Sequence, residues 1–375
     1  MAVVKLKPDE LRIGHEIPWA VEDAAGNLLM RKGYVIRSER QLDSLLARGL
    51  YRAATAENES KDQESEAADS KPTHPFEYFA DFGLRLERII LGIESQAGNI
   101  VPQVLDLAKL IEELCNFDPD AALGMVHLIK EPRYAVSHSL HAAILCELIG
   151  RRLEWPATQR RQVQAAALTA NIAMLTLQEE LQSQSAPLTE AQRAEVRLHP
   201  YNGARQLISL GVDDELWLKI VLQHHERIDG SGYPNALRDD RICQEAKLLA
   251  VADRYAAMVS GRSYRGGIPA RDVLKQLFLA KGKQYDETLS LLLVKELSIF
   301  PPGGFVVLEN GEQAMVIKRP SMGSLHPVVS SFTDAQGVAA PKPVRRNTAL
   351  AGFHVKDVGQ PPVQILNYAS LWGYR

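Results

Sequence analysis

The spacing of apolar residues separates the chain into a short mixed segment, a long helical stretch and a β-rich tail. Apolar side chains recur every three or four residues from Phe79 to Ile93, and again from Val104 to Leu114. This is the repeat of a helix that buries one face. The same pattern continues to Leu297, with short proline and glycine breaks. Residues 75–300 are therefore predicted to form an all-helical domain.

The first 52 residues carry short strand and turn signals. Ile13–Val21 is a candidate strand, and the turn-forming residues 23–27 precede a second apolar run at Leu28–Met30. Ser38 and Gln41 form a capping-box start for a helix that would end before position 50. The pattern predicts a small α+β module over residues 1–52. Such a module is either purely structural or a regulatory, partner-docking domain.

Residues 53–74 differ in composition from the segments on both sides. Acidic residues alternate with serine, glutamine and alanine, and almost no apolar side chain is available for burial. This composition is typical of a solvated, flexible linker. An acidic face for a partner protein is the alternative interpretation.

The tail, residues 301–375, is predicted to be a small β-rich appendage. Two prolines and two glycines at 301–304 end the last helix. The apolar runs 305–308 and 314–318 flank a turn at 309–312, which predicts a hairpin, and a third strand is expected at 327–329. The expected fold is thus mainly α, with an all-helical domain between a small N-terminal α+β module and a small C-terminal β appendage.

Bulk composition narrows the classes of function. The chain has 375 residues and a formal net charge of −3, which gives no reason to expect nucleic-acid or membrane-surface binding. Its three cysteines are few and widely spaced, as in proteins of a reducing cytoplasm. The N-terminus lacks the apolar core of a signal peptide, and no apolar run is long enough to span a membrane. We therefore expect a cytoplasmic protein.

Three histidines at predicted helix ends are candidate metal ligands. His224 and His225 are expected to end a helix over Glu215–Glu226. Because neighbouring helical positions point about 100° apart, the two imidazoles could serve two different metals. His199 is expected to close a helix that Pro200 stops. For any one of these histidines alone, a helix cap or a satisfied core residue is the more common role.

A fourth histidine and a carboxylate complete the candidate set. His138 lies on a predicted apolar helix, and Asp253 has leucine and alanine neighbours at three and four residues on another. Burying a carboxylate is costly unless a cation or strong hydrogen-bond donors compensate it. Arg254 or Arg262 could supply that charge, and a metal ion is the alternative.

The segment from His224 to Pro234 carries the most specific motif of the chain. It reads His-His-Glu-Arg-Ile-Asp-Gly-Ser-Gly-Tyr-Pro. This motif resembles the signature of the HD-GYP family of bacterial cyclic-di-GMP phosphodiesterases. The resemblance covers about Tyr134 to Asp286, and it includes residues 251–258 and 262–265. The order of the histidines, the late aspartate and the loop identify the chain as a member of that family.

The resemblance implies a set of metal ligands and substrate contacts. The family's metal ligands fall on His138, His199, His224, His225 and Asp253. A further carboxylate of some members falls on Tyr134. The basic residues that contact substrate phosphates correspond to Arg262 and Arg265, and the signature loop keeps Asp229 and Tyr233. In the family this loop has been linked to diguanylate-cyclase (GGDEF) domains, which implies such a domain or another signalling protein as a partner.

The chain departs from the family at the catalytic dyad. The family reads roughly Leu-Leu-His-Asp-Ile-Gly-Lys, where residues 168–174 place Ala170 and Asn171 at the dyad and Met174 at the lysine. A carboxylate that bridges two cations offsets their mutual repulsion, and the uncharged Asn171 amide cannot do this. No catalytic residue is intact by this comparison. We therefore expect at most one Fe or Mn ion at the remaining ligands.

These observations leave three hypotheses. The first is a degenerate HD-GYP signalling protein of the cyclic-di-GMP system, which binds nucleotide or a partner and has lost most or all catalysis. In that case Tyr233 and Arg227 form an exposed contact of the composition common at interface hot spots, although the loop could instead serve only to close the preceding helix. The second is a metal-dependent cyclic-di-GMP phosphodiesterase with residual activity. The third is a structural helical domain with vestigial histidines.

Overall fold

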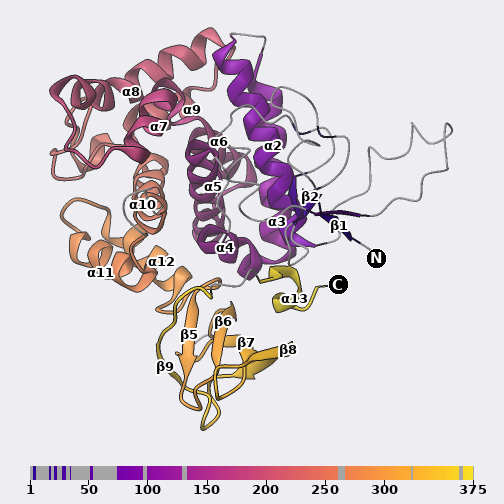
Figure 1. The fold of residues 1–375 in the computed structure, drawn as a ribbon. Helices are drawn as coiled ribbons and strands as arrows, with labels where there is room; N and C mark the ends of the chain where they lie inside the picture. Colours follow the sequence, from indigo (N-terminus) through magenta and orange to yellow (C-terminus); the bar gives the residue numbers. More distant parts are fainter. Residues whose placement is uncertain are drawn as a thin grey trace, which may run out of the picture. The chain divides into compact units, whose positions relative to one another are not determined.

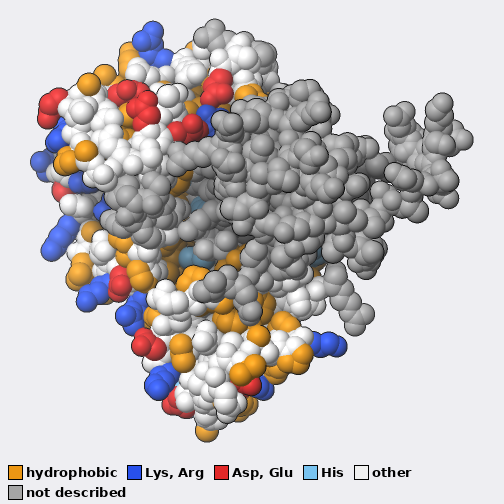
Figure 2. Space-filling view, in the orientation of Figure 1, with side chains coloured by type: hydrophobic (Ala, Val, Ile, Leu, Met, Phe, Trp, Pro, Cys, Tyr) orange, Lys and Arg blue, Asp and Glu red, His pale blue; other side chains and the backbone are white. Residues whose placement is uncertain are grey.

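The computed structural model describes residues 3–5, 17, 21–22, 28–30, 34, 51–53, 74–95, 99–128, 133–260, 267–321, 324–362 and 366–374. Contacts divide the chain into two units, residues 1–84 with 360–375 and residues 85–359. Figure 1 shows the helices and strands, and Figure 2 shows the side chains of the described residues by type in the same orientation. Helix α2 (Pro75–Glu94) begins in the first unit and ends in the second.

The first unit contains a four-stranded antiparallel sheet of short strands. The strands are β1 (Val3–Lys5), β2 (Val21–Glu22), β3 (Leu28–Met30) and β4 (Tyr51–Ala53), in the order β1-β4-β2-β3. The apolar run at 28–30 is the strand β3, whereas most of the candidate strand Ile13–Val21 lies outside the described residues. The predicted helix after Ser38 and the predicted linker core at 54–73 lie outside the described residues. The short helix α13 (Tyr368–Trp372) belongs to this unit, where Trp372 packs edge-on against Phe76 at 5.2 Å between ring centroids.

The second unit is mainly helical, which confirms the predicted fold class. Its helices are α3 (Val101–Phe117), α4 (Pro119–Leu128), α5 (Tyr134–Arg152), α6 (Ala157–Thr169), η2 (Ile172–Met174), α7 (Leu175–Ser183), α8 (Glu190–Ser209), α9 (Glu215–Gln223), η3 (Asp239–Arg241), α10 (Gln244–Val259), α11 (Ala270–Ala280) and α12 (Glu287–Leu297). None of the helices in the described part of the chain combines the length and apolar character needed to cross a membrane.

Helix α5 is the centre of the helical domain. Every residue from Ala135 to Gly150 is buried, and the helix packs chiefly against α6 and α10. The helix is thus buried on every side, although its buried residues include Ser137, His138, Ser139, His141 and Glu147. The one carboxylate in this stretch, Glu147, is fully buried and accepts hydrogen bonds from Arg160 and Gln164 of α6. This pairing satisfies the charge that α5 carries into the core.

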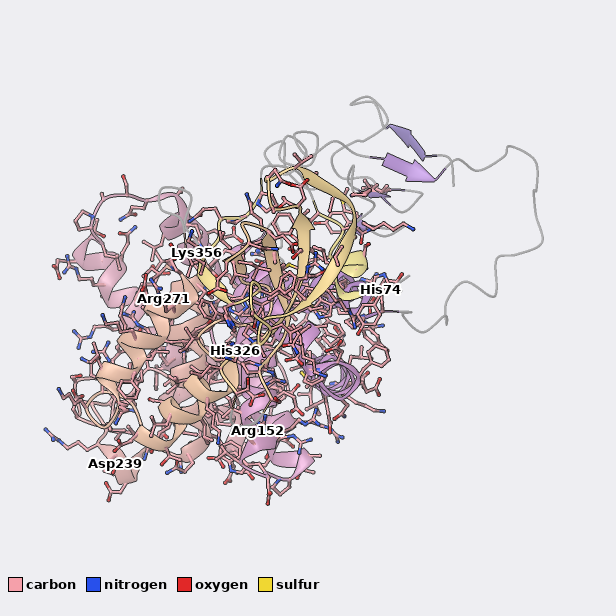
Figure 3. All side chains as sticks on the ribbon, turned by 90° about the horizontal axis from the view of Figure 1, so that it is seen from below. His74, Arg152, Asp239, Arg271, His326 and Lys356 are labelled. Atoms are coloured by element: carbon pink, nitrogen blue, oxygen red, sulfur yellow. The ribbon has the colours of Figure 1, made fainter. Side chains whose placement is uncertain are left out.

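The C-terminal part of the second unit is a five-stranded antiparallel sheet. Its strands are β5 (Phe305–Leu308), β6 (Gln313–Lys318), β7 (Val328–Thr333), β8 (Ala339–Asn347) and β9 (Val355–Val358), in the order β8-β7-β6-β5-β9. The predicted hairpin and third strand are confirmed, because β5 and β6 pair through Phe305 opposite Met315 and β7 follows as their neighbour. Lys356 marks β9 in Figure 3.

The sheet is joined to the helices by close backbone contact and by ion pairs. Gly303 has φ +82°, and a Cβ there would lie 2.7 Å from the carbonyl oxygen of Gly124 on α4. Arg319, just after β6, pairs with Asp120 of α4 and Glu296 of α12. Glu296 also accepts from Arg152 of α5 at 2.7 Å. The sheet therefore packs on α4 and α12 through both backbone and charge.

A buried hydrogen-bond relay also reaches the sheet. His127 of α4 donates from Nδ1 to the carbonyl oxygen of Pro302 at 2.8 Å. Its Nε2 therefore accepts from the Tyr255 hydroxyl of α10, also at 2.8 Å. Tyr255 is fully buried. One imidazole thus connects α4, α10 and the segment that leads into β5.

Replacing Gly303 by alanine should destabilise the protein more than replacing Gly352. Both glycines have φ +82°, but nothing lies within 4 Å of a Cβ at Gly352. Gly352→Ala should lower the free energy of unfolding by about 1 kcal/mol, the cost of a left-handed residue with a Cβ. Gly303→Ala should cost about 1–3 kcal/mol more, because the Gly124 carbonyl must move. Chemical denaturation measures both, and equal losses would contradict the close contact.

The His127 relay predicts a pH dependence of stability. Burial lowers the pKa of His127 from its usual 6.5 to about 4, although its hydrogen bond to Pro302 opposes this shift. Between these values the unfolded chain binds a proton that the folded chain does not, so the free energy of unfolding falls as the pH falls. One such proton contributes at most about 1.4 kcal/mol per pH unit.

His127→Gln is the matched variant, because its amide can keep both hydrogen bonds and does not titrate. Its free energy of unfolding should fall less steeply between pH about 6.5 and about 4 than that of the wild type, since only this proton has been removed. Denaturation series at several pH values measure the difference. Identical slopes for the two proteins would show that His127 is not protected from protonation.

Candidate metal centre

Three histidines, one inside α8 and two at the end of α9, lie together inside the helical domain. Ring nitrogen atoms of His199, His224 and His225 all lie within 4.8 Å of one another. His199 and His224 are buried, and His225 is half-buried. The ring of His225 lies 4.1 Å from that of His224 and 5.0 Å from that of His199, measured between centroids. The three imidazoles therefore form one cluster, called here the histidine cluster.

Helix α8 holds His199 in a way that the sequence interpretation did not foresee. The prediction that Pro200 stops this helix is wrong, because α8 runs from Glu190 to Ser209 with Pro200 inside it. Pro200 has no N–H to donate to the carbonyl of Val196, four residues earlier. The Nδ1 of His199 donates to that carbonyl oxygen instead, at 2.7 Å. The proline thus frees the acceptor that orients the histidine. Thr189 and Gln192 form the capping box that begins α8.

His224 is oriented by a similar bond at the end of α9. The helix ends at Gln223, and not at Glu226 as predicted, so His224 is its C-cap. The Nδ1 of His224 donates to the carbonyl oxygen of Val221 at 2.7 Å. The last carbonyls of a helix have no partner within the helix. The imidazole of His224 can therefore donate to one of these free carbonyl oxygens at the end of α9.

These two bonds decide which nitrogen of each ring carries hydrogen. A carbonyl oxygen only accepts, so Nδ1 of His199 and of His224 must be protonated, and in the neutral rings both Nε2 atoms are unprotonated. The two Nε2 atoms face each other at 3.3 Å. Two lone pairs at this separation repel unless a cation lies near both. The pair is therefore prepared to bind a cation, and a metal held by both nitrogens at about 2.1 Å fits such a spacing.

Burial keeps the histidine cluster neutral. It lowers the pKa of His199 to about 3, with the neighbouring His224 adding to the effect. Burial also lowers the pKa of His224 and, more strongly, that of His225. Neutral imidazole is the form that binds metals. Burial thus favours the neutral, ligating form of all three rings.

His138 and Asp253 form a hydrogen-bonded pair beside the histidine cluster. Nε2 of His138 on α5 donates to Oδ1 of Asp253 on α10 at 2.7 Å. Burial raises the pKa of Asp253, but His138 outweighs this and holds that pKa below its usual range. The charge of Asp253 also acts on His224 and His225. Asp253 is therefore hydrogen-bonded to His138. From the sequence, Arg254 and Arg262 were the candidate partners.

Tyr134 occupies the position one turn before His138 on α5. Its ring stacks on that of His138 with 5.3 Å between centroids. Its hydroxyl lies 3.4 Å from Nδ1 of His138. A phenol in this place supplies an aromatic wall and no negative charge. The structure thus puts Tyr134 next to the candidate ligands.

The dyad positions lie against the helix that carries His199. Ala170 and Asn171, between α6 and η2, are both buried. A Cβ at Gly203, one turn after His199 on α8, would lie 3.6 Å from the carbonyl oxygen of Ala170. The side-chain oxygen of Asn171 is buried and has no hydrogen-bond partner among the described residues. An unmet acceptor inside a protein is costly, so this oxygen marks a place where a donor or a cation would be stabilising. Met174, at the lysine position, is half-buried at the end of η2.

The signature loop is pressed against the histidine cluster. A Cβ at Gly232 would lie 2.6 Å from the carbonyl oxygen of His225, so only glycine fits there. The backbone N–H of Tyr233 donates to that same oxygen at 3.2 Å. The ring of Tyr233 lies 4.7 Å from the His225 ring. Tyr233 and Arg227 are half-buried, and not exposed as predicted. Buried Glu226 accepts from two backbone N–H groups further along the loop, at 2.7 and 2.9 Å. The loop therefore fixes the position of His225.

The remaining predicted site residues lie apart from this cluster or outside the described chain. Asp229 is exposed and accepts from the backbone N–H of Ser231 at 2.8 Å. Hydrogen bonding from Ser231, first through its side chain and then through its backbone N–H, keeps the pKa of Asp229 below its usual value. Arg262 and Arg265 fall in the undescribed residues 261–266. The carbonyls of Val196 and Val221 are site groups that sequence reasoning missed, and the adjacent histidine and proline at 199–200 were the signal for the first.

Comparisons with known proteins agree with this arrangement. The HD domain family matches residues 121–289. The chain is 32% identical to the cyclic di-GMP phosphodiesterase PA4108 of Pseudomonas aeruginosa over 254 residues, which are 68% of this chain and 61% of that protein. It is 27% identical to 3'3'-cGAMP-specific phosphodiesterase 3 of Vibrio cholerae over 180 residues, 48% of this chain and 39% of that protein. The chain thus spans less than two thirds of either relative.

A solved structure supports the fold. It is described as Bd1817, a HDG"Y"P protein from Bdellovibrio bacteriovorus, and its TM-score against this chain is 0.52 at 16% sequence identity. The likeness covers 78% of this chain and 99% of the other. The helical domain, the matched HD domain and the loop that ends in Tyr233 and Pro234 together show that the chain belongs to the HD-GYP family.

Proposed function

We propose that this chain is a degenerate HD-GYP signalling protein that binds one metal ion and a cyclic dinucleotide, with phosphodiester hydrolysis lost or strongly impaired. One observation carries the proposal. The Nε2 atoms of His199 and His224 face each other 3.3 Å apart, while the dyad positions beside α8 hold Ala170 and Asn171. The first feature retains a cation site, and the second removes the residues that would build another.

The histidine cluster suits a first-row transition metal. Imidazole nitrogens favour Fe, Mn or Zn over Mg or Ca. His199, His224 and His225 would hold the ion, with Asp253 adding negative charge next to them. The carbonyl bonds to Nδ1 would keep the rings in place, as the outer partners of metal-bound histidines commonly do. A bound ion would supply a positive charge that attracts and polarises a phosphate oxygen.

A second ion lacks ligands in this chain. Ala170 provides no donor atom, and the Asn171 amide cannot compensate the repulsion between two cations. The imidazole Nε2 of His138 is committed to Asp253. Met174 offers no charge to a phosphate, where a lysine would. Each change weakens the same reaction, so ligand binding without efficient hydrolysis is the expected outcome.

The ligand class follows from the relatives. The Pseudomonas protein is named as a cyclic di-GMP phosphodiesterase and the Vibrio protein as one specific for 3'3'-cGAMP. We expect a cyclic dinucleotide, and cyclic-di-GMP first. Tyr233 and Tyr134 are aromatic residues next to the cluster that could stack on a base. Arg262 and Arg265 would contact the phosphates, as the family resemblance implies.

A signalling partner is a further part of this proposal. Asp229 and Ser231 at the tip of the signature loop are exposed, whereas Gly232 and Tyr233 are held against His225. A diguanylate-cyclase (GGDEF) domain or another signalling protein could therefore contact the tip and affect the histidine cluster through the same short loop. Residual phosphodiesterase activity is the alternative function, and the retention of all five ligand positions favours it.

Metal content tests the cation site. Protein purified with Mn or Fe should contain at most one equivalent, and His225→Ala or His199→Ala should remove most of it, because each deletes one of three ligands. His326→Ala, which removes an exposed histidine ahead of β7 (Figure 3), is the control and should keep the metal. Elemental analysis of the purified variants measures this. Two stoichiometric ions, or full metal content in His225→Ala, would contradict the proposal.

Restoring the family residues tests the loss of catalysis. The wild-type protein should hydrolyse cyclic-di-GMP far more slowly than intact relatives, because single transition-state contacts are each worth roughly a hundredfold to a thousandfold in rate. The triple variant Ala170→His, Asn171→Asp, Met174→Lys should raise both the metal content and the turnover. Hydrolysis under saturating Mn measures the rates. Wild-type turnover at the level of intact relatives would refute the impaired site.

A further inference from the structure

Helix α8 has two opposite faces with different environments. The inner face, with His199, Gly203 and Leu207, is buried and packs towards α9 and η2. On the other side lie Ala194, Leu198, Tyr201, Arg205 and Ile208, all exposed. Leu198, Tyr201 and Ile208 are 51%, 49% and 59% exposed. We call these five residues the outer stripe of α8.

The residues of the outer stripe lie on the side of α8 opposite the buried residues, and they recur at regular intervals. Successive helical residues are about 100° apart, which places the stripe roughly 180° from the buried residues. Its members follow one another at intervals of four, three, four and three residues. This alternation is the seam of a two-helix coiled coil, in which each apolar residue packs between residues of the facing helix. A stripe of this kind fits another helix.

We propose that the outer stripe is the contact surface of a two-fold dimer, in which α8 packs antiparallel against α8 of a second copy of the chain. In the antiparallel register that sets Leu198 opposite Tyr201 of the partner subunit, two-fold symmetry repeats the same pair on the other side. Arg205 then lies opposite Ala194 of the partner subunit, with Glu195 of the partner subunit next to it. This proposal is independent of the proposed function of the metal centre.

The charges on α8 favour a second copy of the chain as the binding partner, and they favour the antiparallel direction. Within the described residues neither Arg205 nor Glu195 has an ion-pair partner, and Arg205 only lies over the Tyr201 ring at 5.8 Å. The two-fold arrangement pairs both charges twice. A parallel arrangement would instead set Arg205 against Arg205 of the partner subunit, and like charges in a seam are unfavourable. The outer stripe is thus complementary to itself in one direction only.

The length of α8 limits the strength of the dimer. Its 20 residues span about 30 Å. Two helices in contact over that length bury less than the roughly 800 Å² per partner of a standard interface. The dimer should therefore be reversible, with a dissociation constant in the micromolar range.

Sedimentation velocity of the whole chain from about 2 to about 200 μM, where interfaces of this size dissociate, tests the dimer. The wild type should shift from monomer to dimer over this range. Leu198→Glu should abolish the shift, because it buries a charge opposite Tyr201. Leu279→Glu, at a leucine of α11 that is 63% exposed, is the matched control and should dimerise like the wild type. Thermal melting should be unchanged in both variants, since both positions are exposed.

A charge swap tests the register. Arg205→Glu alone or Glu195→Arg alone should weaken the dimer about tenfold, because each puts like charges together. The double variant should regain the wild-type affinity. Within one chain these residues lie too far apart on α8 to contact each other, so rescue can only arise between copies. A wild type that stays monomeric at the highest concentration, or a double variant weaker than either single one, would overturn the proposal.

Discussion

The centre of this protein depends on two hydrogen bonds from imidazole to backbone. His199 and His224 each give their Nδ1 hydrogen to a carbonyl three residues earlier, on Val196 and Val221. Neither carbonyl has a backbone donor within its helix. Pro200 has no N–H to offer Val196, and α9 ends before a residue could donate to Val221. Without the two hydrogen bonds either ring could turn its protonated nitrogen inwards. The local backbone therefore decides that unprotonated Nε2 atoms face each other.

The loop around Gly232 completes this arrangement from the other side. Its backbone is so close to the carbonyl of His225 that no side chain fits, and Glu226 holds the rest of the loop by accepting two backbone N–H groups. The loop thus positions one histidine of the cluster while its tip, at Asp229, remains exposed. A conformational change at the tip has a short path to the His225 ring. The same sequence motif can in this way serve both packing and recognition.

The sequence predicted the elements well where periodicity or turn chemistry is local. The helical spacing of apolar residues predicted α2 and α3, and the turn before Gln313 predicted the β5–β6 hairpin. These elements are determined by residues close to one another in the sequence. The sequence-based prediction was wrong at Pro200. Proline usually ends a helix, but here the side chain of His199 donates to the carbonyl that Pro200 leaves without a donor. The end of α9 and the partner of Asp253 were also missed or left open. The partner of Asp253 lies 115 residues away in the chain, and the end of α9 is followed by a loop that folds back on Glu226 from nine residues further along. One sequence reveals neither contact.

The junction between helices and sheet has a consequence for how such proteins can exchange parts during evolution. Gly124, His127 and Asp120 of α4 each contact the C-terminal segment, through a backbone approach to Gly303, a bond to Pro302 and an ion pair with Arg319. A gene fusion that replaced the sheet would leave Nδ1 of the buried His127 and the carboxylate of Asp120 without these partners. Losing the sheet would therefore destabilise α4. Because His127 also bonds Tyr255, two residues after Asp253, a foreign sheet would disturb the helix that carries this carboxylate.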